Sequence, residues 1–146
     1  MVNFRKITED NFDAIIKMKR PEAENFVATN AFSLAQAWLY RDDGDVFPFA
    51  IYDDDTVVGF MLLEEDMEDE RLDLWRIMLP PENEGKGYGT AAVELMIQYA
   101  KESGKHKSIG LLCGPKNYNA RHIYDKLGFQ PTGEICYGDV EMRLCL

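Results

Sequence analysis

The sequence predicts one α/β domain in which a mixed, mostly antiparallel sheet is flanked by about four helices. Its 146 residues match the usual size of a single domain, so one unit is expected over 1–146. Strand-like segments follow one another in the first half, which is typical of antiparallel pairing. A strongly helical segment then lies between two apolar strand-like segments, as in a βαβ unit. This order of elements favours a layered α/β architecture.

The first half of the chain is expected to form two helices and four strands. Thr8 is a suitable N-cap for the first helix, because two acidic residues follow it in the first turn. Pro21 lies at or just beyond the end of that helix. Ser33 is expected to cap a second helix that includes Tyr40. The expected strands are residues 2–6, 47–52, 56–63 and 72–79.

The second half is expected to form two helices, one strand and a closing hairpin. Residues 90–103 have helical spacing that places four apolar residues on one face. Residues 117–126 form the other helix, which stops before Gly128, a suitable C′ residue. The strand covers 108–112, and the hairpin pairs 132–135 with 140–144 around Gly138.

Charge and composition restrict the possible partners. The net charge is −10, which disfavours nucleic acid and fits a small cationic substrate, although an acidic surface also serves solubility. Six of the seven residues 64–70 are acidic, which predicts a solvated loop. No apolar run approaches the roughly 18 residues of a membrane span, and no signal-like segment begins the chain, so a cytoplasmic protein is expected. The three cysteines form no CxxC pair, so no metal site is expected.

The segment 84–90, Glu-Gly-Lys-Gly-Tyr-Gly-Thr, has the features of a phosphate-binding loop. Glycines let successive backbone N–H groups point at one spot, and the helix that follows adds its positive N-terminal end. The order of Lys86 and Thr90 does not fit a P-loop, and the acid that a dinucleotide fingerprint needs is missing from the next strand. An ordinary glycine-rich turn is the alternative.

The helix 117–126 has a second pattern of chemical interest. Asn117, Ala120 and Tyr124 fall on nearly one helical face, where the small residue leaves room for a ligand chain. The phenol of Tyr124 can donate a proton to a leaving thiolate, whose conjugate acid has a similar pKa. A tyrosine on such a face is also typical of a protein core.

These two patterns, about 30 residues apart and in this order, resemble those of the GNAT acetyltransferase superfamily. The resemblance implies a GNAT fold, acetyl-CoA as the acetyl donor, and direct attack by an amine. It implies cofactor binding by the loop residues Gly85, Lys86, Gly87, Tyr88, Gly89 and Thr90. It also implies a pantetheine contact from Asn117, a general acid in Tyr124, and backbone contacts from Ile77 and Leu79 at a bulged strand. Many relatives form dimers, so a homodimer is possible.

The resemblance also bears on two acidic residues, Asp73 and Glu84. Asp73 matches a position where some members place a carboxylate base that acts through water; a solvated acid near a hairpin end is the alternative. Glu84 departs from the family pattern, which has Gln or Arg there. A carboxylate beside a pyrophosphate is unfavourable, so its side chain is expected to turn away, and Lys86, Lys116 and Arg121 can offset the acidic background.

Residues 20–30, 33–37 and 48–52 resemble bacterial spermine/spermidine N-acetyltransferases of the diamine type. In this interpretation, Glu22, Glu24 and Asp73 line a trough for a polycation, and Trp75 contacts its methylene and ammonium groups. Two alternatives remain open. One is the same chemistry on a protein N-terminus, an amino acid or an aminoglycoside, and the other is an acyl-CoA-binding module without turnover.

Overall fold

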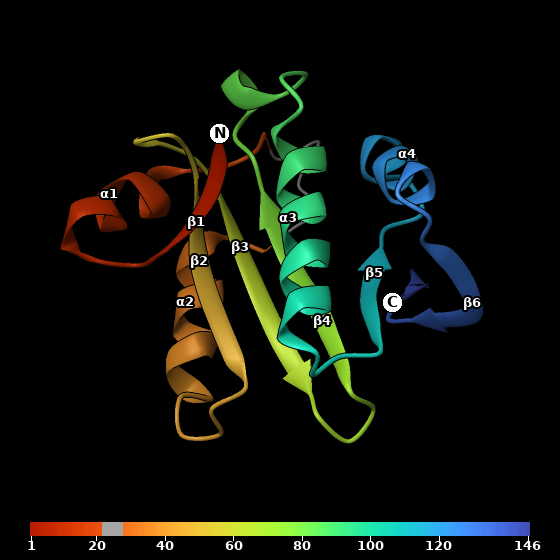
Figure 1. The fold of residues 1–146 in the computed structure, drawn as a ribbon. Coiled ribbons are helices and arrows are strands. Elements are labelled where there is room, and N and C mark those ends of the chain that lie inside the picture. Colours follow the sequence, from red (N-terminus) through yellow and green to blue (C-terminus); the bar gives the residue numbers. More distant parts are fainter. Residues whose placement is uncertain (22–27) are drawn as a thin grey trace.

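The computed structural model describes residues 1–21 and 28–146, and in this part of the chain a seven-stranded sheet is packed against four α-helices (Figure 1). This confirms the expected fold class. The sheet order is β1-β2-β3-β4-β5-β7-β6. The elements are β1 (Val2–Lys6), α1 (Glu9–Lys17), α2 (Asn30–Leu39), β2 (Val46–Asp53), β3 (Thr56–Asp66), β4 (Arg71–Met78), α3 (Tyr88–Ser103), β5 (Ser108–Cys113), α4 (Tyr118–Lys126), β6 (Gln130–Cys136) and β7 (Asp139–Cys145), with a 3-10 turn at Pro81–Asn83.

The sheet opens between β4 and β5, its one parallel pair among the described strands. Pairing there stops after Leu74, which lies opposite Leu111, and the rest of β4 has no partner on that edge. On the other edge, Trp75 is an extra residue, because Leu62 faces Arg76 whereas Leu63 faces Leu74. Such a bulge bends the strand and increases its twist. The bulge and the early end of pairing leave a wedge between the two strands.

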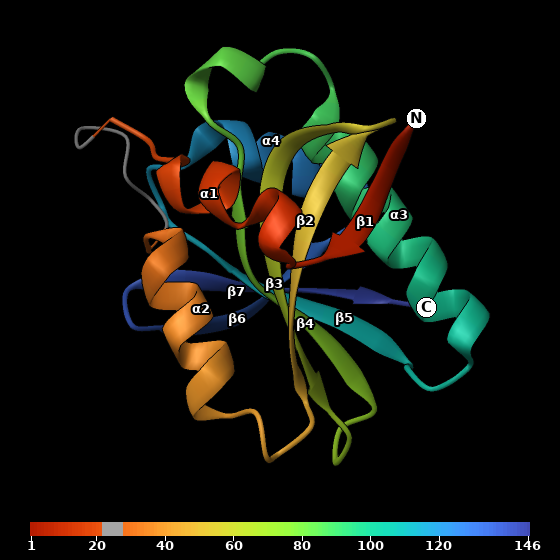
Figure 2. The same ribbon diagram turned by 90° about the vertical axis from the view of Figure 1, so that its left-hand side faces the viewer.

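Helices cover both faces of the sheet, and Figure 2 shows α2 and α3 on opposite sides. On one face, α3 contributes Ala92, Val93 and Met96 to the larger core cluster. On the other, Ile15 of α1 belongs to a smaller cluster. Alternate residues of β3 point to the two clusters, as the period of a strand requires: Met61 and Leu63 to the first, Phe60 and Leu62 to the second. The central strands are therefore covered on both sides.

Two local predictions were wrong, the N-cap of the second helix and the solvated loop over 64–70. The N-cap of α2 is Thr29, whose Oγ1 accepts a hydrogen bond from the backbone N–H of Phe32. Ser33 lies inside the helix, fully buried, where its hydroxyl accepts from Arg76 of β4. Tertiary packing therefore overrode local preference, since serine is the better N-cap of the two residue types.

The acidic segment 64–70 is not simply a solvated loop. Strand β3 continues to Asp66, so the first three acids belong to the sheet. Arg71 forms ion pairs with Asp66 at 3.0 Å and Asp69 at 2.9 Å. This arginine supplies the countercharge that allows acidic residues to be ordered beside one another. No helix in residues 1–21 and 28–146 is long and apolar enough to cross a membrane.

Candidate functional site

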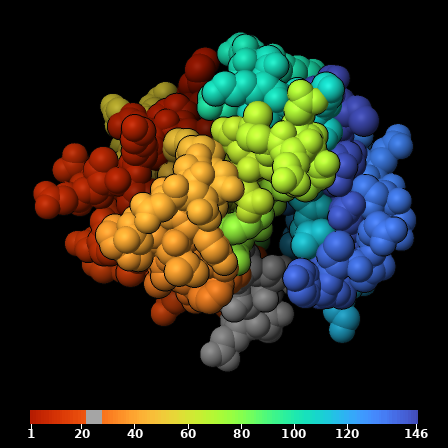
Figure 3. Space-filling model, turned by 90° about the horizontal axis from the view of Figure 1, so that it is seen from below, coloured from red at the N-terminus to blue at the C-terminus, as the bar shows by residue number. Residues whose placement is uncertain are grey.

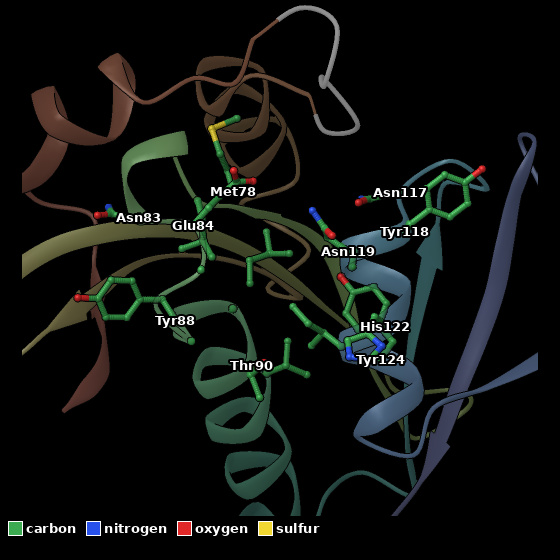
Figure 4. Close-up of a pocket in the computed structure, with 18 of the residues that line it drawn as sticks. Met78, Asn83, Glu84, Tyr88, Thr90, Asn117, Tyr118, Asn119, His122 and Tyr124 are labelled. Atoms are coloured by element: carbon green, nitrogen blue, oxygen red, sulfur yellow. The ribbon is translucent and has the colours of Figure 1, made fainter.

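A cleft of about 830 Å³ lies where the end of β4, the start of α3 and the helix α4 meet (Figure 4). The structure brings together here most of the residues that the sequence singled out: Ile77, Leu79, Gly85, Gly87, Tyr88, Gly89, Thr90, Asn117 and Tyr124. Lys86 is the exception among the predicted loop residues, because it is exposed and does not line the cleft. The two sequence patterns therefore form opposite walls of one site.

The loop wall presents unused backbone donors. Gly85 and Gly87 have φ angles of 72° and 83°, a conformation that glycine adopts without a steric penalty. Gly87 is the N-cap of α3, and its carbonyl accepts the first helical bond, from Ala91. Within the described residues, the amide groups from Gly85 to Thr90 donate no hydrogen bond. These donors and the helix N-terminus suit an anion such as a pyrophosphate.

The side chain of Tyr88 connects the loop 84–90 to β2 and is not directed across the cleft. Its hydroxyl donates to Asp53 at the end of β2 over 2.9 Å, and the labelled ring points away from α4 (Figure 4). The bond to this carboxylate raises the pKa of the Tyr88 hydroxyl, with burial adding to the effect. A cofactor contact from Tyr88 therefore comes from its backbone.

Close backbone approach positions the β4 wall. A Cβ atom on Gly59 of β3 would lie 2.8 Å from the carbonyl oxygen of Met78 and 2.6 Å from Leu79. A Cβ atom on Gly89 would lie 3.3 Å from the Leu79 side chain. These two glycines let β3 and α3 pack directly on the end of β4, where its unpaired edge faces the wedge. Gly59 could not be identified from sequence, because the close approach that requires a glycine there involves residues outside its own strand.

The α4 wall carries the candidate acid. Tyr124 is only 7% exposed and meets Phe129 edge to face, with ring centroids 5.8 Å apart. Its hydroxyl makes no hydrogen bond within the described part of the chain and faces the cleft (Figure 4). Burial raises the pKa of this hydroxyl well above its ordinary value, and nearby Cys113 adds to the shift. The phenol is therefore protonated at neutral pH and available as a donor.

Asn117 begins the same wall. It occupies the N-cap position of α4, yet its side chain makes no capping hydrogen bond. Its amide is therefore available to a ligand in the cleft. Asn119 and His122 also line this wall, and the sequence analysis did not select them because neither belongs to a spacing of known chemistry.

Glu84 also lines the cleft, but its carboxylate is held by Arg20 from the segment after α1, with Oε1 and Nη1 2.6 Å apart. Nη1 of the same arginine donates to the carbonyl oxygen of Leu79 over 3.1 Å. Arg20 was not predicted as a site residue, because 59 residues separate it from Leu79 in sequence.

Asp73 and Trp75 lie in a second cleft of about 240 Å³, which borders β4, β5 and the C-terminal hairpin. Seen from below, the surface is hollowed between the green segment of β4 and the blue C-terminal segments (Figure 3). None of the described residues that line this cleft also lines the larger one. The structure therefore separates the two predicted catalytic residues, Tyr124 and Asp73, on different clefts.

Each described carboxylate that lines the second cleft is paired with an arginine. Asp73 accepts from Nε of Arg71 over 2.7 Å and from its Nη2 over 3.2 Å. Arg143 pairs with Glu141 at 3.3 Å. This part of the expected trough is thus balanced in charge. Glu22 and Glu24, the other predicted members, lie outside the described residues.

Comparison with known proteins agrees with this geometry. The model of the acetyltransferase (GNAT) family matches residues 12–129. The spermine/spermidine N(1)-acetyltransferase of Bacillus subtilis is 26% identical over 141 residues, which cover 92% of this chain and 91% of that protein. The spermidine N-acetyltransferase of Vibrio cholerae, solved with CoA and spermine, superposes with a TM-score of 0.78 at 18% identity, over 99% of this chain and 95% of that one. The PaiA N-acetyltransferase of Thermoplasma acidophilum, solved with coenzyme A, gives 0.76 at 17% identity over 100% and 99%.

Proposed function

This chain belongs to the acetyltransferase (GNAT) family and uses acetyl-CoA, and we propose that its acceptor is a primary amine of a polyamine such as spermine or spermidine. The observation that carries the acceptor class is the 26% identity to the Bacillus subtilis spermine/spermidine enzyme, which extends over 92% of this chain. The net charge of −10 supports the proposal, since it attracts a polycation.

The larger cleft fits the cofactor. Acetyl-CoA, when bound, supplies a thioester and a pyrophosphate. In this proposal the unused amides from Gly85 to Thr90 hold the pyrophosphate, and Gly85 and Gly87 leave open space where side chains would stand. The unpaired edge of β4 near Ile77 and Leu79, together with Asn117, orients the pantetheine arm. The site thereby fixes the thioester relative to Tyr124.

The reaction is a direct transfer. The nitrogen of a neutral amine attacks the thioester carbon, a C–N bond forms, and the C–S bond breaks. The Tyr124 hydroxyl donates a hydrogen bond to the departing sulfur, and the thiolate takes up the proton that the acylated nitrogen releases. A thiol has a pKa of about 8.5, below that of the buried phenol, so Tyr124 acts chiefly by hydrogen bonding as charge develops on sulfur. Transfer needs no acyl-enzyme.

Before it attacks, the ammonium form of the amine must lose a proton to become neutral. We keep Asp73 as the proposed acceptor of this proton through a water molecule, since it lines the cleft on the other side of the wedge. The ion pair with Arg71 orients its carboxylate. Replacement of Asp73 by Asn tests the role, with loss of kcat expected to be largest at low pH, where the amine is most protonated.

The function is tested by acetyl-CoA-dependent thiol release with spermine, spermidine, putrescine, a peptide N-terminus and an aminoglycoside side by side. Saturable turnover with spermine or spermidine alone supports the proposal. Turnover with a different amine keeps the mechanism and refutes the polyamine assignment. Cofactor binding without turnover on any amine of the panel contradicts the polyamine proposal and favours a binding module. The Tyr124→Phe variant is the matched control, because it keeps the cleft and removes one oxygen.

A further inference from the structure

We propose that Arg20 is a cofactor-binding residue, which supplies the positive charge that the loop 84–90 needs to hold the pyrophosphate of CoA. The proposal rests on the assignment of this loop to the pyrophosphate in the proposed function. It starts from an electrostatic problem in the structure. The loop begins with a carboxylate, Glu84, and the whole chain has a net charge of −10, so both oppose a polyanionic ligand.

The contacts of Arg20 solve this problem locally. Its guanidinium pairs with Glu84 at 2.6 Å, and the arginine side chain is 13% exposed whereas that of Glu84 is 45% exposed. A partly buried ion pair is screened less by salt than a surface pair. Arg20 is itself one of the residues that line the larger cleft. The acid therefore holds the cation beside the anion site instead of repelling the anion.

The placement of charge in the cleft singles out this arginine. The other cationic side chains among the described lining residues are Lys116 and Lys126, which flank the opposite wall formed by α4. Lys86, although within the loop, does not line the cleft. On the wall made by β4 and the start of α3, Arg20 is the cation that the described lining residues supply. A guanidinium is also suited to phosphate because its N–H groups match phosphate oxygens in pairs.

The second contact makes Arg20 a link between the two parts of the cofactor site. By donating to the carbonyl oxygen of Leu79 over 3.1 Å, it ties the end of β4 to Glu84 at the start of the loop. An alternative role is therefore purely structural: a clamp that shapes the β4 end and touches no phosphate. The two roles differ in which part of the cofactor they affect.

The test compares ligands with and without phosphate. Dissociation constants for CoA and for pantetheine are measured by calorimetry on the full chain and on Arg20→Gln, without an acceptor amine. We expect Arg20→Gln to weaken CoA binding by about tenfold to a hundredfold, and to leave pantetheine binding unchanged. The affinity of the variant for CoA should also depend less on salt concentration. Equal weakening of both ligands, or no weakening of CoA binding, overturns the proposal.

Three further variants serve as controls for the Arg20→Gln measurement. Lys19→Gln removes the same charge from an exposed neighbour and is expected to change CoA affinity less than twofold. Glu84→Gln removes the acid and should preserve or tighten CoA binding, which a structural clamp would not do. Gly87→Glu distinguishes an error in the loop assignment from an error in the role of Arg20. If it binds CoA normally, the loop assignment fails; if it binds poorly while Arg20→Gln binds normally, the role of Arg20 alone is refuted.

Discussion

Replacing Tyr124 with phenylalanine removes one oxygen from the cofactor cleft and leaves the packing of the ring in place. The hydroxyl makes no hydrogen bond within the described residues, so its loss should change the free energy of unfolding by no more than about 0.5 kcal/mol. Phe129 keeps its edge-to-face contact with the ring. The variant therefore isolates the chemistry of the hydroxyl from the stability of the fold.

The expected loss of kcat is about tenfold to a thousandfold, which corresponds to about 1.4 to 4 kcal/mol of transition-state free energy. The upper part of the range for general acids is not expected, because burial raises the pKa of Tyr124 and makes full proton transfer to sulfur unfavourable. The dissociation constant for acetyl-CoA should stay within about twofold, since the contact with the thiolate is made only as the C–S bond breaks.

The assay follows thiol release at saturating amine, with acetyl-CoA affinity measured separately by calorimetry in the absence of amine. An unchanged kcat would remove Tyr124 from the reaction. A loss of acetyl-CoA affinity with kcat unchanged would show that the hydroxyl binds the ground state and the transition state equally. Thermal unfolding of the variant within about 2 °C of the parent is the control for folding.

Substitutions at three more positions test other parts of the structure. Gly59→Ala places a Cβ 2.8 Å from the carbonyl oxygen of Met78, so we expect destabilisation by about 1–3 kcal/mol and weaker CoA binding; an unchanged melting temperature would contradict the close approach. Gly87→Glu puts a charged side chain at a position in the loop 84–90 where the backbone is left-handed, and it should abolish CoA binding. Gly87→Ala shows the effect of backbone strain alone. Burial raises the pKa of Glu64, with Asp73 adding to the shift, so ionisation of Glu64 destabilises the native state as pH rises from its unfolded to its folded pKa. Glu64→Gln should therefore be more stable than the parent at pH 7 and equal to it near pH 3.5; a difference independent of pH, measured by thermal unfolding, would refute this origin.

The two residues proposed to act in catalysis lie in different clefts. The larger cleft holds the neutral phenol of Tyr124, and the smaller one holds Asp73 in its ion pair with Arg71. In the proposed mechanism, the hydrogen-bond donor to sulfur and the proton acceptor thus belong to different clefts beside the wedge that opens beyond Leu74. Because each carboxylate described in the smaller cleft is paired with an arginine, selectivity for a polycation there depends on acids outside this group.

Much of this site could be predicted from sequence, because its signals are local. A glycine-rich loop before a helix creates unused donors whatever surrounds it, and the amides from Gly85 to Thr90 donate no hydrogen bond to any described residue. The spacing of Asn117 and Tyr124 places both on one face of one helix, and both line the cleft. The order of strands and helices was likewise readable, since each depends on hydrophobic periodicity within its own segment.

Only the tertiary structure decided the features that depend on residues far apart in sequence. Serine is the better N-cap in isolation, yet α2 is capped by Thr29, and Ser33 lies inside the helix in contact with Arg76. The pairing of Glu84 with Arg20 joins segments that no local pattern relates. Charge and close packing act through space, whereas propensity and periodicity act along the chain. For that reason the loop and helix of the site follow from sequence, and the charges around them follow from the fold.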